Sequence, residues 1–120
     1  LLLLGSERRL RADLVLALGI LHHLVLGAGI SLADALRHLA APADHALIIE
    51  FVGTDDELVR NEPQFFRAFS RNPDRFSSFT LAAVRDALEA MGWDVSVVPS
   101  FPDTRSLLSC NRKISAGTPA

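Results

Sequence analysis

The feature that most constrains the fold is the apolar stretch at residues 13–27, DLVLALGILHHLVLG. It opens with an unbroken apolar run at residues 14–18, which is followed by Gly19 and by the adjacent pair His22 and His23. A run of this kind, without alternation of polar residues, is typical of a parallel strand that is buried on both faces. Open α/β sheets bind ligands just beyond the carboxyl ends of such strands. The sequence therefore predicts a functional edge at the residues that follow the run.

Two other interpretations of this stretch are disfavoured. A membrane-spanning helix needs about 20 predominantly apolar residues, whereas histidines and glycines interrupt the stretch. A zinc site on a helix needs ligands three or four positions apart, and neighbouring histidines are expected to point in different directions. No metal site and no membrane span are therefore predicted. Two readings of the pair stay open: His22 and His23 both serve catalysis, or one packs in the core while the other caps or faces solvent.

Length, charge and cysteine content narrow the class of protein. A chain of 120 residues is expected to form one domain. The net charge is −2 and no basic block occurs, so binding to a nucleic-acid backbone is not indicated. The single Cys110 suits a reducing compartment, which predicts a cytoplasmic protein, and it is expected to be a small buried residue in a strand.

A second apolar strand is predicted at residues 46–52, after a helix that begins at Ser31 and ends at Ala41-Pro42. Its one charged residue, Glu50, lies near the carboxyl end. A strand, a helix and a strand in this order form a parallel, right-handed crossover. Glu50 should therefore lie at the same sheet edge as the histidine pair, either as a catalytic group or as a structural acid that is bonded nearby.

The segment at residues 53–79 predicts short helices and turns. Asp55 and Asp56 are suited to begin a short helix through Val59. Three phenylalanines at helical spacing, Phe65, Phe66 and Phe69, are expected to pack in the core. The sequence Asn72-Pro73-Asp74 is typical of a turn.

The last part of the chain predicts a helix and two strands. Thr80 is expected to cap a helix through Met91 that Gly92 ends. The strands are predicted at residues 95–98 and 105–112. Because the connection at residues 99–104 is too short for a parallel return, the two strands must pair antiparallel, with both prolines of the connection outside the ladder.

The complete order is strand, helix, strand, helices, strand and antiparallel strand. It resembles the second half of the class I S-adenosylmethionine-dependent methyltransferase fold, an α/β fold with a Rossmann-like sheet that ends in an antiparallel hairpin. The resemblance extends to sequence segments of a bacterial subgroup of these enzymes, namely DLVLALGILHHLVLG, LIIEFVGTDD, FTLAAVRDALEAMGW and VVPSFPDTRSLLSC. We accordingly expect a lead-in at residues 1–12, the carboxyl-terminal half of a methyltransferase domain at 13–113 and a disordered tail at 114–120.

The resemblance implies a cofactor, a partner and a set of site residues. The cofactor is S-adenosylmethionine, most of whose binding half is expected to lie outside this chain, and the substrate is an unidentified methyl acceptor. Leu18, Gly19 and Ile20 would face the methionine end of the cofactor, and His22, His23 and Glu50 would form the catalytic group. One histidine would take a proton from the acceptor.

Two alternatives follow from the same residues. The first strand lacks a predicted neighbour on its outer edge, so the chain is expected either to form a homodimer or to pair with a missing amino-terminal half. A non-catalytic α/β interaction module that uses this edge is the main alternative to an enzyme. A flavodoxin-like domain is a weaker one, since such domains do not usually end in a hairpin.

Overall fold

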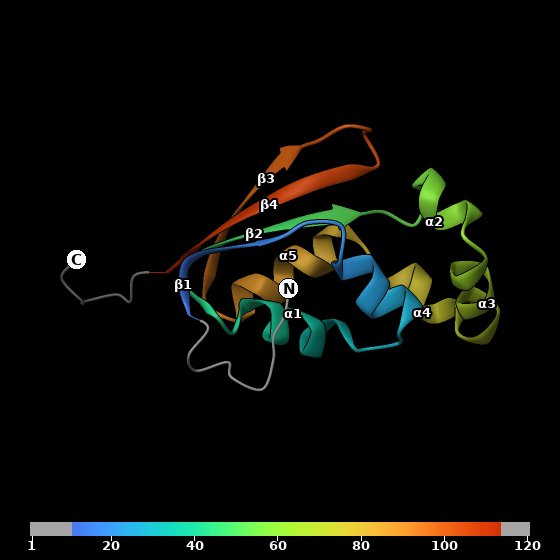
Figure 1. Ribbon diagram of the computed structural model, residues 1–120, viewed down its shortest axis with the longest axis horizontal. Coiled ribbons are helices and arrows are strands. Elements are labelled where there is room, and N and C mark those ends of the chain that lie inside the picture. The colour runs from blue at the N-terminus through green and yellow to red at the C-terminus, as the bar shows by residue number, and fades with distance from the viewer. Residues whose placement is uncertain (1–10, 114–120) are drawn as a thin grey trace.

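The computed structural model describes residues 11–113 as a four-stranded sheet with helices on one side (Figure 1). The strand order is β1-β2-β4-β3; β1 and β2 are parallel, and the β2–β4 and β4–β3 pairs are antiparallel. The strands are β1 (Ala12–Ala17), β2 (Ala43–Val52), β3 (Trp93–Pro99) and β4 (Arg105–Arg112). The parallel pair and the final antiparallel hairpin confirm the predicted mixed α/β topology.

The strand positions confirm the sequence prediction, with differences at the ends. β4 has the predicted bounds, whereas β2 begins three residues earlier than predicted and β3 extends further at both ends. Pro99 is the last residue of β3 and lies opposite Ser106, so the prediction that it lies outside the ladder is wrong. A proline can occupy this place because the end of a strand does not require its missing N–H.

Within residues 11–113, six helical elements and one short helical turn lie between the strands. Two of the predicted helix starts are confirmed, because the Ser31 side chain accepts a hydrogen bond from Asp34 N and that of Thr80 accepts one from Ala83 N. The elements are η2 (His23–Gly27), a π-helix, and the α-helices α1 (Leu32–Ala40), α2 (Glu57–Asn61), α3 (Pro63–Arg71), α4 (Pro73–Ser78) and α5 (Leu81–Ala90), with one further helical turn at residues 21–22.

Two predictions for the middle of the chain are wrong. The Asn-Pro-Asp sequence is not a turn: Asn72 caps α4 and its side chain accepts a hydrogen bond from Arg75 N. Of the three phenylalanines of α3, only Phe65 is buried, whereas Phe66 and Phe69 are 67% and 48% exposed. Helical spacing places residues on neighbouring faces of a helix, but it does not determine which of these faces the rest of the chain covers.

The two faces of the sheet differ strongly. One face packs against the helices through buried side chains such as Leu47 and Ile49 of β2 and Leu108 of β4. On the other face, Leu14 and Leu16 of β1 are 48% and 53% exposed. The first strand is therefore buried on one face only in the described residues, and the prediction that both of its faces are buried does not hold for this chain. Among residues 11–113, β1 pairs with β2 alone. The prediction that its outer edge is exposed is therefore confirmed for the described residues.

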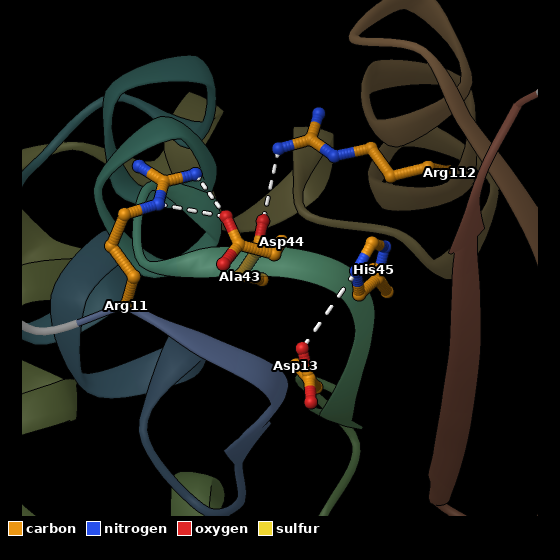
Figure 2. A network of polar contacts seen from close by, with 6 residues as sticks. All are labelled: Arg11, Asp13, Ala43, Asp44, His45 and Arg112. Atoms are coloured by element: carbon orange, nitrogen blue, oxygen red, sulfur yellow. Dashed lines mark hydrogen bonds and ion pairs between the residues drawn. The ribbon is translucent and has the colours of Figure 1, made fainter.

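Polar contacts connect the amino-terminal ends of β1 and β2 and the end of β4 (Figure 2). Arg11 pairs with Asp44, His45 lies 3.7 Å from Asp13, and Arg112 donates a hydrogen bond to the Ala43 carbonyl oxygen. The Arg11–Asp44 pair is partly exposed and the His45–Asp13 contact is largely exposed, and pairs at such positions contribute little to stability.

Within residues 11–113, no helix has the length and apolar character that crossing a membrane requires. Most of the predicted lead-in (residues 1–10) and the predicted tail at 114–120 lie outside the described residues.

Candidate functional site

The candidate site begins where β1 ends. Gly19 has φ = +67°, a left-handed conformation that favours glycine, and it turns the chain from β1 into a short helical segment. This segment continues as the π-helix η2, in which Ala28 N donates to the His23 carbonyl oxygen at 2.8 Å. The two histidines lie at the junction of the α-helical and π-helical turns. Such π-helical insertions are rare and occur frequently at functional sites.

The rings of His22 and His23 lie against each other and against Phe65 of α3. The two imidazole centroids are 4.3 Å apart, and the Phe65 ring lies 5.8 Å from His22 and 5.3 Å from His23. The expectation that adjacent histidines point apart is therefore wrong, because the helical turn brings the rings together. Their surroundings differ, since His22 is buried and His23 is exposed.

Burial determines the charge of His22. Desolvation lowers its pKa to about 4, and the positive charges of His23 and Arg105 act in the same direction, whereas Asp56 opposes them. The ring is therefore neutral at pH 7. Its Nδ1 atom is buried and has no hydrogen-bond partner among the described residues. A neutral, buried imidazole of this kind serves as an aromatic surface for its neighbours.

His23 has a polar partner from a different helix. Its Nδ1 atom lies 3.4 Å from Nε2 of Gln64, the residue of α3 that precedes Phe65. Two consecutive residues of α3 thus contact the histidine pair, one through its amide and one through its ring. The other ring nitrogen of His23, Nε2, belongs to a side chain that faces solvent.

Glu50 lies near the carboxyl end of β2 on the open face of the sheet, opposite Leu107 of β4. Its Oε1 atom is 3.7 Å from the position that a Cβ atom on Gly19 would take. The structure thus brings Glu50 to the loop after β1, at the predicted edge. No hydrogen bond or ion pair joins Glu50 to either histidine in the described part of the chain, so its predicted role in orienting a histidine stays a prediction.

A buried ion pair holds the turn after β2 against the start of β4. Asp56 is 1% exposed and accepts hydrogen bonds from Arg105 Nε at 2.9 Å, from Arg105 Nη2 at 3.3 Å, from Thr104 Oγ1 at 2.6 Å and from Leu58 N at 2.9 Å. The Arg105 hydrogen bonds are the main reason that the pKa of Asp56 falls to about 2, although burial opposes them. Asp56 caps α2, as predicted, and its pairing with Arg105 places two opposite charges that act on the pKa of His22 in opposite directions.

Three residues of the site, Gln64, Asp56 and Arg105, were not predicted from the sequence. Gln64 lies 41 positions from His23, and Asp56 lies 49 positions from Arg105. Side chains at such separations meet only through the tertiary structure. The one local signal was the pair of acidic residues after the second strand, Asp55 and Asp56, of which Asp56 is buried.

Other polar groups lie away from this edge. Cys110 is buried, as expected, and burial raises the pKa of its thiol to about 11. A cavity of about 510 Å³ is lined by residues of α1 and α4, including Ser31 and Arg75, with none of the predicted site residues on its wall. The part of the chain that the structure describes holds no cluster of three or more side chains suited to bind a metal ion.

Comparison with known proteins gives one informative match. No protein-family model matches the sequence, and no curated protein matches it. Among solved structures, the chain is similar to the crystal structure of magnesium protoporphyrin IX methyltransferase from Synechocystis PCC 6803 with bound SAH. The TM-score is 0.53 and the sequence identity is 19%. The likeness covers 86% of this chain and 46% of the other, so this chain spans less than half the length of that enzyme.

The chain has a class I methyltransferase-like fold. A sequence identity of 19% supports a similarity in fold and nothing further. In this methyltransferase-like sheet, the histidine pair and Glu50 lie at the carboxyl ends of the two parallel strands, where open α/β sheets bind their ligands. Leu18, Gly19 and Ile20 form the turn at the same place. Their predicted contact with a cofactor stays a prediction.

Proposed function

We propose that this chain is the carboxyl-terminal half of an S-adenosylmethionine-dependent methyltransferase, which acts on an unidentified acceptor as part of the complete protein. The main support is the likeness in fold to a methyltransferase over 86% of the chain. The strand order supports it too, because a parallel pair followed by an inserted antiparallel hairpin is what the predicted family fold requires. That enzyme's structure holds SAH, the product of S-adenosylmethionine, which favours this cofactor here.

The residues of the turn after β1 fit one end of such a cofactor. Gly19 leaves the backbone open at the carboxyl end of β1, and the partly buried Glu50 carboxylate beside it suits a positive charge. S-adenosylmethionine supplies a methyl group on a positively charged sulfur. Residues 18–20 would line this end. Residues 11–113 contain no G-x-G-x-x-G loop after a strand, so the remainder of the cofactor would rest on another part of the protein.

His23 is the group of this chain that is best suited to accept a proton. Methyl transfer depends mainly on alignment of the acceptor with the methyl group, and an acceptor that carries a proton must lose it to a nearby base. His22 is buried and held neutral at pH 7, whereas His23 is exposed. The acceptor atom would bond to the methyl carbon as the bond between that carbon and the cofactor's sulfur breaks, which leaves neutral S-adenosylhomocysteine, and the acceptor's proton would pass to His23.

The test uses the complete protein encoded by the full reading frame. We expect it to bind S-adenosylmethionine in titration calorimetry. With an acceptor in hand, His23→Ala should lower turnover about 10²-fold, the range for loss of a general base. Glu50→Gln should lower it too, and His22→Ala should act through misplacement of His23. Wild-type turnover in all three folded variants would show that the site is elsewhere.

A second function is favoured by the open face of the sheet. An edge strand that exposes Leu14 and Leu16 is a template for pairing with another chain. A non-catalytic module that associates through β1 would use this surface. It would bind no S-adenosylmethionine even as the complete protein, and this outcome separates it from the enzyme.

A further inference from the structure

We propose that Gln64 is a positioning residue for His23, and that it leaves His23 Nε2 as the nitrogen that exchanges protons. The role in turnover rests on the function proposed above, whereas the hydrogen bond itself does not. The inference starts from the 3.4 Å contact between Gln64 Nε2 and His23 Nδ1. Within residues 11–113, the side chains of His22 and His23 make no other hydrogen bond.

The hydrogen bond assigns different tasks to the two ring nitrogens. A neutral imidazole carries its proton on one nitrogen and a lone pair on the other, and a partner at one nitrogen determines what the other can do. With Nδ1 joined to Gln64, Nε2 is the atom left to meet an acceptor. An amide suits this task because it offers a donor on one side and an acceptor on the other. In the structure the NH₂ group faces Nδ1, which then holds the lone pair, so the neutral ring carries its proton on Nε2. A half-turn of the amide lets its oxygen accept a hydrogen bond from a protonated Nδ1, and this gives Nε2 the lone pair that a base needs.

Packing restricts the ring in the remaining directions. His22 lies on one side of His23 with ring centroids 4.3 Å apart, and Phe65 contacts both rings. Phe65 is 1% exposed and anchors α3 in the core, which holds the backbone of the exposed neighbour Gln64 next to the histidine pair. Stacking alone does not distinguish the two orientations of the imidazole that a half-turn about its Cβ–Cγ bond exchanges. The Gln64 hydrogen bond distinguishes the two orientations, because it is made only when Nδ1 faces α3.

Charges near the pair favour the same division of tasks. Arg105 is positive and Asp56 negative next to His22, and burial keeps His22 neutral. His22 therefore stays neutral at pH 7, and a proton taken from an acceptor would go to the exposed ring of His23. Gln64 can stabilise the resulting cation through its amide oxygen without adding a charge of its own.

The experiment is nitrogen NMR of the 120-residue chain with ¹⁵N-labelled histidine. The ring nitrogens of His23 report which atom carries the proton and which is hydrogen-bonded. We compare the wild type with Gln64→Leu, which removes both donor and acceptor, and with Gln64→Glu, which retains an acceptor. Arg67→Leu, an exposed change one turn further along α3, is the matched control. The signals of His38 and His45, which lie on α1 and β2, serve as internal references.

We expect Gln64→Leu to change the Nδ1 and Nε2 shifts of His23, and Gln64→Glu to drive the Nδ1 proton fraction toward one. Arg67→Leu should leave both shifts unchanged. Identical His23 shifts in the wild type, Gln64→Leu and Gln64→Glu would overturn the inference. In the complete enzyme, Gln64→Leu should lower kcat roughly tenfold, a part of the 10²-fold or more that a general base contributes, with KM unchanged and with recovery in Gln64→Glu. Failure of the proposed function would instead appear as wild-type turnover in His23→Ala, with the NMR result intact.

Discussion

Acidification from pH 7 to pH 4 should destabilise this protein through one buried group, His22. Its ring is 4% exposed and packed against His23 and Phe65. In the unfolded chain this imidazole takes up a proton near its ordinary pKa of 6.5, whereas the folded state binds the proton only near pH 4. Because the unfolded state binds more protons in this interval, acid favours unfolding.

The size of the effect follows from the two pKa values. The stability that the neutral ring contributes is fully present above pH 6.5 and is lost as the pH falls toward 4. A fall in pKa from 6.5 to about 4 corresponds to a loss of about 3 kcal/mol in the free energy of unfolding at pH 4. The total free energy of unfolding of a small domain is about 5–15 kcal/mol, so a loss of this size is easily measured. Asp56 acts in the same direction but only below about pH 4, since its folded pKa is about 2.

Urea unfolding at several pH values between 7 and 4 measures this loss. Trp93 is the single tryptophan and is buried, so its fluorescence reports unfolding. We expect His22→Phe, a ring of similar shape that cannot titrate, to reduce the loss between pH 7 and 4 by about 3 kcal/mol. The control His38→Phe alters an exposed histidine on α1 and should retain the wild-type profile. Parallel losses in the wild type and His22→Phe would refute the reasoning.

Three further predictions concern the ion pair, the cofactor and the exposed strand. Asp56→Asn should lower the free energy of unfolding by about 3 kcal/mol because it leaves Arg105 without its partner; the exposed neighbour Glu57→Gln should have little effect in the same urea titration. The 120-residue chain should bind S-adenosylmethionine weakly or not at all in calorimetry, and micromolar affinity would contradict the proposed division of the site. The chain should associate or aggregate as its concentration rises in light scattering, and Leu16→Lys on β1 should reduce this association; a concentration-independent monomer in the wild type would count against an exposed edge.

Most of the sheet could be predicted because its signals are local. The apolar runs of β1 and β2 are separated by a helix, which requires a parallel pair, and the short connection between β3 and β4 at residues 100–104 permits only an antiparallel one. Caps such as Ser31 and Thr80 depend on residues three positions away. Each of these features is determined within a short segment, and each was found in the structure.

The arrangement of the candidate site could not be predicted, because distant segments form it. Nothing in the sequence around His23 indicates that Gln64 approaches its Nδ1 atom, or that a π-helix brings its ring against His22. The same reason explains the error at Phe66 and Phe69. Their exposure depends on where α3 lies relative to η2 and α4, which helical periodicity does not specify.

The buried ion pair links the stability of the site to its chemistry. Arg105 joins the start of β4 to the turn after β2 through Asp56, and its positive charge also disfavours a proton on His22. In Asp56→Asn this charge would no longer be offset, so the tendency of His22 to stay neutral would increase while the fold is weakened. Burial and the charge of Arg105 thus keep His22 neutral at pH 7 and leave the exposed ring of His23 to contact an acceptor. Gln64, His22 and Phe65 contact this ring at the carboxyl end of the parallel strands.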